Sequence, residues 1–205
     1  SSGTTDATGK SAKLNNPYSI TTDGTSLYVA DFGNHTIRKI VISTGVVTTL
    51  AGTAGSSGST NGTGMSARFY KPVGLTTDGN NLYVADTYNH TIRKIVISTG
   101  VVTTLAGTAG SPGSMDGTGT SAKFYYPTGL TTDGANLYVA GYSMHTIRKV
   151  VISSRVVTTV AGTAGSSGTT DGTGTSAKFY LPIGTAIDGN NLYVVDRYNH
   201  SIRKI

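Results

Sequence analysis

The chain has 205 residues and a net charge of +6, contains no cysteine, and only 13% of its residues are charged. These values exclude a disulfide-built domain, and the absence of any stretch near the ~20 apolar residues of a membrane helix excludes a helical membrane protein. The positive charge suits an anionic partner, but small secreted β-proteins are commonly mildly basic, and we favour that explanation.

One segment of the sequence occurs four times. "LYVADFGNHTIRKI" starts at Leu27, and near copies start at Leu82, Leu137 and Leu192, so the period is 55 residues. Val, Ile, Thr and Tyr favour β-strands, and the 28 glycines suit tight turns. A strict period of this size indicates a solenoid or a propeller.

The second copy predicts four strands in chain order. The first is expected at 73–78, before the turn signal Asp78-Gly79, and the second at 81–86, where both faces are apolar. The third is expected at 91–98 and the fourth at 101–107. The fourth is rich in Thr, so we expect it to be the outermost strand. A Gly/Ser/Thr-rich loop follows, and its aromatic residues Phe124 and Tyr125 are expected to pin it to the core.

Four antiparallel strands with short turns form one blade of a β-propeller, and neighbouring blades cover each other's faces. We therefore predict an all-β propeller with a single array over 1–205, whose blades lie at about 1–55, 56–110, 111–165 and 166–205. A parallel β-helix is the alternative.

The copies resemble the NHL repeat. The resemblance rests on the motif P-x-G-L-x-x-D-x-x-N-L-Y-V-A-D-x-x-N-H-x-I-R-K-I followed by G-V-V-T-T-L-A-G, seen at 72–107. It covers essentially the whole chain and implies a β-propeller of the bacterial secreted or surface type. The third copy departs from the motif, because Gly141 replaces the aspartate and Met144 replaces the asparagine.

Four histidines and four Arg-Lys pairs recur with the same period. Each histidine lies in the turn after the second strand, where four of them are too far apart to bind one ion; we expect each to bond the backbone of its turn, helped by the nearby carboxylate. Adjacent residues of a strand point to opposite faces, so only one cation of each pair can face a ligand. We expect one to pair with the second-strand aspartate, and we consider nucleic acid an improbable partner.

The acidic residues predict no catalytic or metal site. The Asp-Gly turns, and the DGTG loops at Asp116 and Asp171, lack the closely spaced ligands of a calcium loop, so we assign them to turn chemistry. The first strands offer no acid–base pair, and glutamate and cysteine are absent. The sequence therefore predicts no enzyme, no cofactor and no metal.

The last copy stops in its third strand. Ser1 aligns with Ser56 and Ile205 with Ile95, so the fourth copy contains no fourth strand. Its third strand would present an open edge, which is a template for pairing. We predict a self-association edge, completed by another copy of the chain or by the continuation of a longer polypeptide. The edge consists of Ser201, Ile202, Arg203, Lys204 and Ile205.

These features favour a non-enzymatic extracellular or cell-surface scaffold for adhesion or self-assembly, in which an unclosed head-to-tail interface would build a filament. The expected partners are the chain itself, or another surface protein or glycan, with no membrane insertion. The alternative is a propeller that binds a glycan, a peptide or RNA through its loops or channel.

Overall fold

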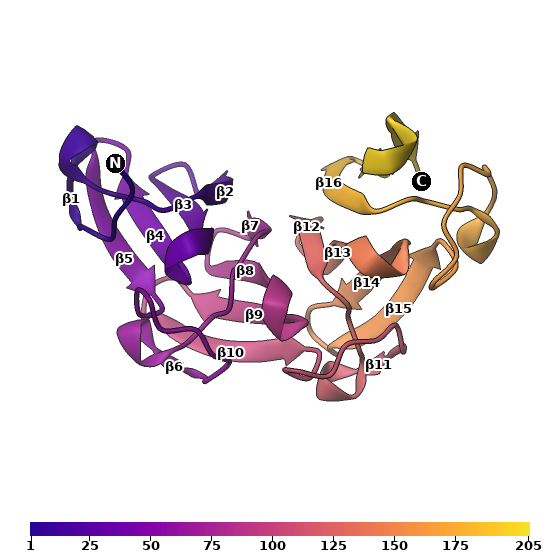
Figure 1. The fold of residues 1–205 in the computed structure, drawn as a ribbon, viewed down its shortest axis with the longest axis horizontal. Helices are drawn as coiled ribbons and strands as arrows, with labels where there is room; N and C mark the ends of the chain where they lie inside the picture. Colours follow the sequence, from indigo (N-terminus) through magenta and orange to yellow (C-terminus); the bar gives the residue numbers. More distant parts are fainter. The chain divides into compact units, whose positions relative to one another are not determined.

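The computed structural model describes residues 1–205, which form β-strands and single-turn 3-10 helices (Figure 1). The chain divides into two compact units. The first contains Ser1–Asn89 and Arg93–Thr104, and the second contains His90–Ile92 and Leu105–Ile205. The sequence copies form four antiparallel sheets, and each sheet is one blade.

The first two sheets each have five strands, in the order β1-β5-β4-β3-β2 and β6-β10-β9-β8-β7. The strands of the first blade are β1 (Ala7–Thr8), β2 (Pro17–Thr22), β3 (Ser26–Asp31), β4 (Thr36–Val41) and β5 (Val46–Ala51). Those of the second are β6 (Gly62–Thr63), β7 (Leu75–Thr77), β8 (Asn81–Asp86), β9 (Thr91–Val96) and β10 (Val101–Ala106).

The third sheet repeats this order as β11-β15-β14-β13-β12, and the fourth has three strands in the order β16-β17-β18. The third blade contains β11 (Gly117–Thr118), β12 (Pro127–Thr132), β13 (Asn136–Gly141), β14 (Thr146–Val151) and β15 (Val156–Ala161). The fourth contains β16 (Pro182–Asp188), β17 (Asn191–Asp196) and β18 (Ser201–Lys204). The predicted all-β propeller fold, with a last blade of three strands, is confirmed.

The prediction that the Thr-rich fourth strand is the outermost strand of each blade is wrong. In each of the first three blades a two-residue strand from the preceding loop pairs outside the Thr-rich strand: β1 with β5, β6 with β10, and β11 with β15. The loop reaches this position because the side chains described below fasten it to the sheet. The predicted second strand coincides with β8, and the third and fourth end one or two residues early. That all four copies form one domain stays a prediction.

Within each unit, the two neighbouring blades bury each other's faces, as expected. In the first unit, one face of the first blade, with Tyr28, Ala30 and Ile37, packs in one core cluster against Leu82 and Ile95 of the second. We call the face toward the following blade the leading face, and the face toward the preceding blade the trailing face. The second unit has the corresponding cluster, made of Ala140, Ile147, Ala161, Ala177, Phe179, Leu192 and Val194.

Loop residues complete these clusters. Phe69 and Phe124 are buried, which confirms the prediction for Phe124, whereas Tyr125 is only half-buried. Each phenyl ring lies 5.3 Å from a guanidinium carbon, that of Arg93 or Arg148, and so also makes a cation–π contact.

Candidate functional site

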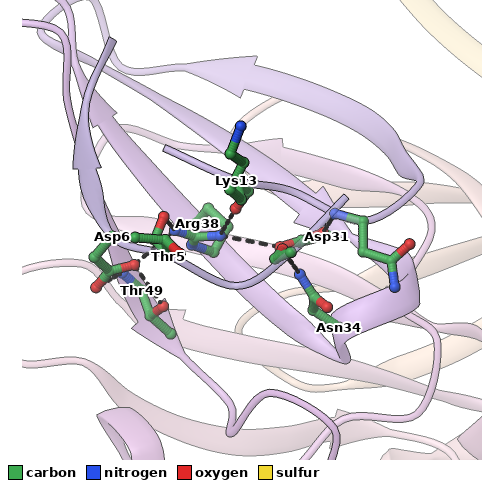
Figure 2. A network of polar contacts seen from close by, with 9 residues as sticks. Thr5, Asp6, Lys13, Asp31, Asn34, Arg38 and Thr49 are labelled. Atoms are coloured by element: carbon green, nitrogen blue, oxygen red, sulfur yellow. Dashed lines mark hydrogen bonds and ion pairs between the residues drawn. The ribbon is translucent and has the colours of Figure 1, made fainter. Parts of the chain in front are cut away.

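A buried clamp fastens each loop to its blade, and Figure 2 shows it in the first blade. Arg38 donates from Nη1 to Asp31 Oδ2 at 3.1 Å and to the carbonyl of Lys13 at 2.8 Å. Asn34 donates from Nδ2 to the same carboxylate at 2.7 Å and to the carbonyl of Gly3. The Arg38 and Asp31 side chains are 1% and 0% exposed. The predicted pairing of one cation with the second-strand aspartate is confirmed.

The second and fourth blades repeat the clamp. Arg93 pairs with Asp86 at 2.9 Å, and Arg203 pairs with Asp196 at 3.2 Å. Complete burial raises the pKa of Asp86 to about 6, although Arg93 and Asn89 stabilise its charged form. Since Arg38, Arg93 and Arg148 are buried, these guanidinium groups do not form a basic surface for phosphates.

The third blade keeps its turn without the aspartate and asparagine. Gly141 and Met144 stand at these positions, yet His145 has the same left-handed backbone (φ 59°) as His35 (φ 61°). Arg148 still donates to the carbonyls of Lys123 and Met115. Arg148 therefore still contacts its loop without the second-strand aspartate and asparagine.

The aspartates of the loops were assigned wrongly to turn chemistry. Asp116 accepts from Arg148 Nη2 at 2.6 Å, and Asp171 accepts from Arg203 Nη2 at 2.5 Å. Asp6 pairs with Arg38 in the same way, and Asn61 replaces the aspartate in the second blade. The separation of 32 positions between each loop residue and its arginine is the same in all four copies, but every pair of positions in a strict repeat keeps its spacing, so the sequence did not single out this pair.

The histidines connect successive blades. His35 Nδ1 accepts from the Lys71 amide at 3.2 Å, His90 from Tyr126 at 3.3 Å, and His145 from Leu181 at 3.1 Å. The expected bond to the backbone is present, but it reaches the next copy, and the carboxylate expected to help bonds Asn and Arg instead. Burial lowers the pKa of His35, His90 and His145, which favours the neutral, accepting form.

The Asp-Gly turns are confirmed in three copies. Asp23 Oδ1 accepts from the amides of Thr25 and Ser26, and its Oδ2 accepts from the Tyr28 hydroxyl at 2.7 Å. Asp78 and Asp133 make the corresponding bonds. Asp188 differs: it pairs through its backbone with Asn191 at the end of the β16-β17 hairpin. No group of three or more His, Cys, Asp or Glu side chains lies close enough to hold a metal ion.

The predicted edge lies on β18, which has a single neighbour, β17. Leu192 and Ile205 exchange both backbone hydrogen bonds, at 3.0 and 2.8 Å. Because hydrogen-bonded and non-bonded pairs alternate along an antiparallel ladder, the backbone groups of Ile202 and Lys204 point away from β17. Ile202 is 66% exposed and Ile205 40%. Arg203 belongs to the clamp, so it is not a free edge cation.

A hollow lies beside this edge. In the first unit, Val102 of β10 is buried in the cluster that contains Tyr28, Leu82 and Ile95, against which Leu50 packs. In the second unit, the hollow is lined by the residues that lie 110 positions later in the chain: Tyr138, Val160, Leu192 and Ile205. The hollow thus has the side chains that surround a fourth-strand valine elsewhere in the chain.

Two polar groups flank the same edge. In the third blade, Asp116 accepts from both the amide and the hydroxyl of Thr159 in β15, each at 3.0 Å. The equivalent Asp171 side chain is 94% exposed, against 48% for Asp116. In each of the first three blades, the amide of a loop glycine donates to the carbonyl that precedes the fourth strand. Gly174 is the equivalent glycine in the loop of the fourth blade. The donors are Gly9, Gly64 and Gly119.

Comparisons with known proteins identify the repeat. The family model of the NHL repeat matches residues 69–95 and 179–205. The chain is 32% identical over 180 residues, 81% of its length, to human NHL repeat-containing protein 2. The chain contains NHL repeats. It spans about a quarter of the length of that relative.

Solved structures share the fold of this NHL-repeat chain. An auxiliary nutrient binding protein from Bacteroides ovatus has a TM-score of 0.72 at 22% identity, over 94% of this chain and 48% of that chain. A virginiamycin B lyase from Staphylococcus aureus has a TM-score of 0.59 at 16% identity, over 96% of this chain and 60% of that chain. At these identities the likeness shows the propeller fold. No helix is long and apolar enough to cross a membrane.

Proposed function

We propose that the NHL blades form a non-enzymatic extracellular scaffold, for adhesion or structural self-assembly, whose β18 edge binds an extended strand. The hollow beside β18 carries this proposal, because Tyr138, Val160, Leu192 and Ile205 reproduce the surroundings of Val102. β-strand addition gains affinity from main-chain hydrogen bonds and specificity from pockets for alternate side chains. If assembly through such contacts does not close, it produces a filament.

The other blades define what the added strand must contain. A valine would enter the hollow, as Val102 does in the first unit. A threonine two positions later would donate to Asp171, as Thr159 does to Asp116. A carbonyl before the valine would accept from Gly174, as that of Arg155 does from Gly119. The preferred partner is therefore an extended segment with the sequence Val-x-Thr.

The aspartates support the absence of catalysis. Three of the ten lie in the clamps, three cap the Asp-Gly turns and three pair with arginines through the loops. The remaining one, Asp188, is exposed. A general acid–base mechanism needs a titratable group within reach of substrate, and nine of the ten carboxylates are engaged in bonds within the fold.

A titration with a labelled peptide tests the proposed edge. The peptide copies residues 100–107, GVVTTLAG, and its control carries aspartate in place of the valine that corresponds to Val102. We expect saturable binding of the first peptide only. Lys204→Pro removes an outward amide and should abolish binding, whereas Lys204→Ala should preserve it. Equal binding of the two peptides, or no binding, would overturn the proposal.

An aromatic cluster favours the alternative, a ligand-binding propeller. Tyr18 lies 4.6 Å from Phe32 between ring centroids, and Tyr70 lies 5.2 Å from Tyr88. Lys71 Nζ lies 5.3 Å from the Phe32 centroid and 4.8 Å from that of Tyr88. Exposed tyrosines beside a cation suit a ring-shaped ligand such as a glycan. A glycan array with wild type and Tyr18→Ala tests this alternative, which requires binding that the variant loses.

A further inference from the structure

The two end blades expose side chains on faces that are covered where one blade follows another within a unit, although Val29 and Val47 on the trailing face of the first blade stay buried, at 5% each. On the leading face, Ile37 and Ile147 are 0% exposed, but their counterpart Ile202 in the fourth blade is 66% exposed. On the trailing face, Leu75 is 5% exposed, but its counterpart Ile20 in the first blade is 58% exposed. The exposed side chains occupy the same strand positions as the buried ones.

These two faces are the complementary halves of one interface. In the first unit, the leading face of the first blade meets the trailing face of the second in one apolar cluster. In the second unit, the third and fourth blades meet in the same way. The leading face of the fourth blade therefore matches the trailing face of the first blade of another copy. Burial of apolar side chains is the main driving force of most protein association.

A polar pair points to the same contact. Lys71, Tyr126 and Leu181, the residues that donate to a histidine of the preceding blade, have left-handed backbones with φ of 52°, 48° and 51°. Asn16, 55 residues before Lys71, has the same conformation with φ 53°. His200 has the same left-handed turn as the other histidines, with φ 52°. The amide of Asn16 and the ring of His200 are thus preset as donor and acceptor.

We infer that copies of this chain associate head to tail, with the leading face of the fourth blade packed on the trailing face of the first blade of the next copy. His200 of one copy accepts from the Asn16 amide of the other, as His35 accepts from Lys71. This inference rests on the proposed scaffold function and names its partner as a second copy. It uses the faces of the end blades, whereas strand addition uses the β18 edge.

Several side chains depart from the internal interfaces. Leu14 stands where the later copies have Phe69, Phe124 and Phe179, and Ile20 stands where the second and third copies have leucine. Val195 stands where the first three blades have Ala30, Ala85 and Ala140, and it is 38% exposed. Val195→Ala restores the internal face and should preserve association. Val195→Lys and Ile20→Lys place a charge on the leading and the trailing face, and each should weaken self-association by at least about tenfold.

Multi-angle light scattering over a concentration series, with a mixing step, tests the inference. We expect the wild type to grow in mass with concentration and each lysine variant to remain monomeric. A mixture of the two variants should form dimers and stop, because each supplies the one intact face that the other needs. A wild type that stays monomeric, or a mixture that stays monomeric when the wild type assembles, would overturn the inference. Peptide binding by Ile20→Lys at β18 reports on the edge separately, and circular dichroism confirms that both variants fold.

Discussion

His35 Nδ1 accepts a hydrogen bond from the backbone amide of Lys71, 36 residues further along the chain and in the next blade. The same bond recurs from Tyr126 to His90 and from Leu181 to His145. The histidine of the repeat therefore fixes one blade to the next, while the arginine clamp fixes each loop to its own blade. These two sets of contacts hold the loops and the blades in place.

Replacing a connecting histidine should weaken the contact between two successive blades and so lower the free energy of unfolding. His145→Asn keeps a residue that tolerates the left-handed turn but shortens the side chain that accepts from Leu181. We expect a loss of about 0.5–1.5 kcal/mol in the free energy of unfolding, the net value of one hydrogen bond. Urea denaturation of the dilute chain measures it. His200→Asn is the matched control, and a loss as large as that of His145→Asn would contradict the assigned role.

Mild acid should weaken the same contacts. Burial lowers the pKa of His35, His90 and His145 below the ordinary 6.5, so the unfolded chain takes up protons first as the pH falls. Their contribution is complete above pH 6.5 and is lost as the pH falls through the lowered values. Urea midpoints between pH 7.5 and 5 should therefore decline. The triple variant with asparagine at these positions should show a flatter profile.

A second acid transition should come from the Asp-Gly turns. The Tyr28 hydroxyl, together with backbone amides, lowers the pKa of Asp23 below its ordinary 3.8. The charged form is stabilised in the fold, so this contribution is present above pH 3.8 and is lost on further acidification. Asp23→Asn keeps an acceptor for the turn and removes the titrating group. Thermal unfolding between pH 5 and 2 should show a shallower decline for the variant than for wild type.

Breaking the buried clamp should lower the free energy of unfolding. Asp86→Ala leaves the buried Arg93 guanidinium without its carboxylate, and removal of one partner of a buried pair costs about 3–5 kcal/mol. Asp188→Ala, at an exposed aspartate, should change stability by less than about 0.5 kcal/mol. Chemical denaturation compares the two. Equal effects would mean that the clamp contributes nothing.

The third blade lacks the aspartate of the clamp, so the clamp can be restored there instead of broken. A Cβ on Gly141 would lie 3.0 Å from Thr146 Oγ1, a tight contact, but Asp31 and Asp86 occupy the same place beside Thr36 and Thr91. The double change Gly141→Asp with Met144→Asn restores the clamp. We expect a gain of about 0.5–2 kcal/mol, the range of consensus substitutions. A lower urea midpoint would show that the third blade has adapted to its glycine.

The period and the alternation of apolar residues were enough to predict the blades, the four main strands of each blade in chain order, and the pairing of one cation of an Arg-Lys pair with the second-strand aspartate. They missed the two-residue outer strand β1, because Ala7 and Thr8 carry no strand pattern and are placed by contacts of the loop. The roles of Asp116 and His35 were also missed. Both bond residues more than 30 positions away, and only the folded sheet brings these partners together.

Hydrogen exchange at β18 tests the central claim most directly. The amides of Ile202 and Lys204 should exchange fast in the dilute chain and slow down when the peptide GVVTTLAG is added, while the Arg203 amide, which faces β17, stays unchanged. The peptide with aspartate in place of its second valine should give no protection. If Ile202 and Lys204 exchange at the same rate with and without the first peptide, β18 does not accept a strand and the account is wrong.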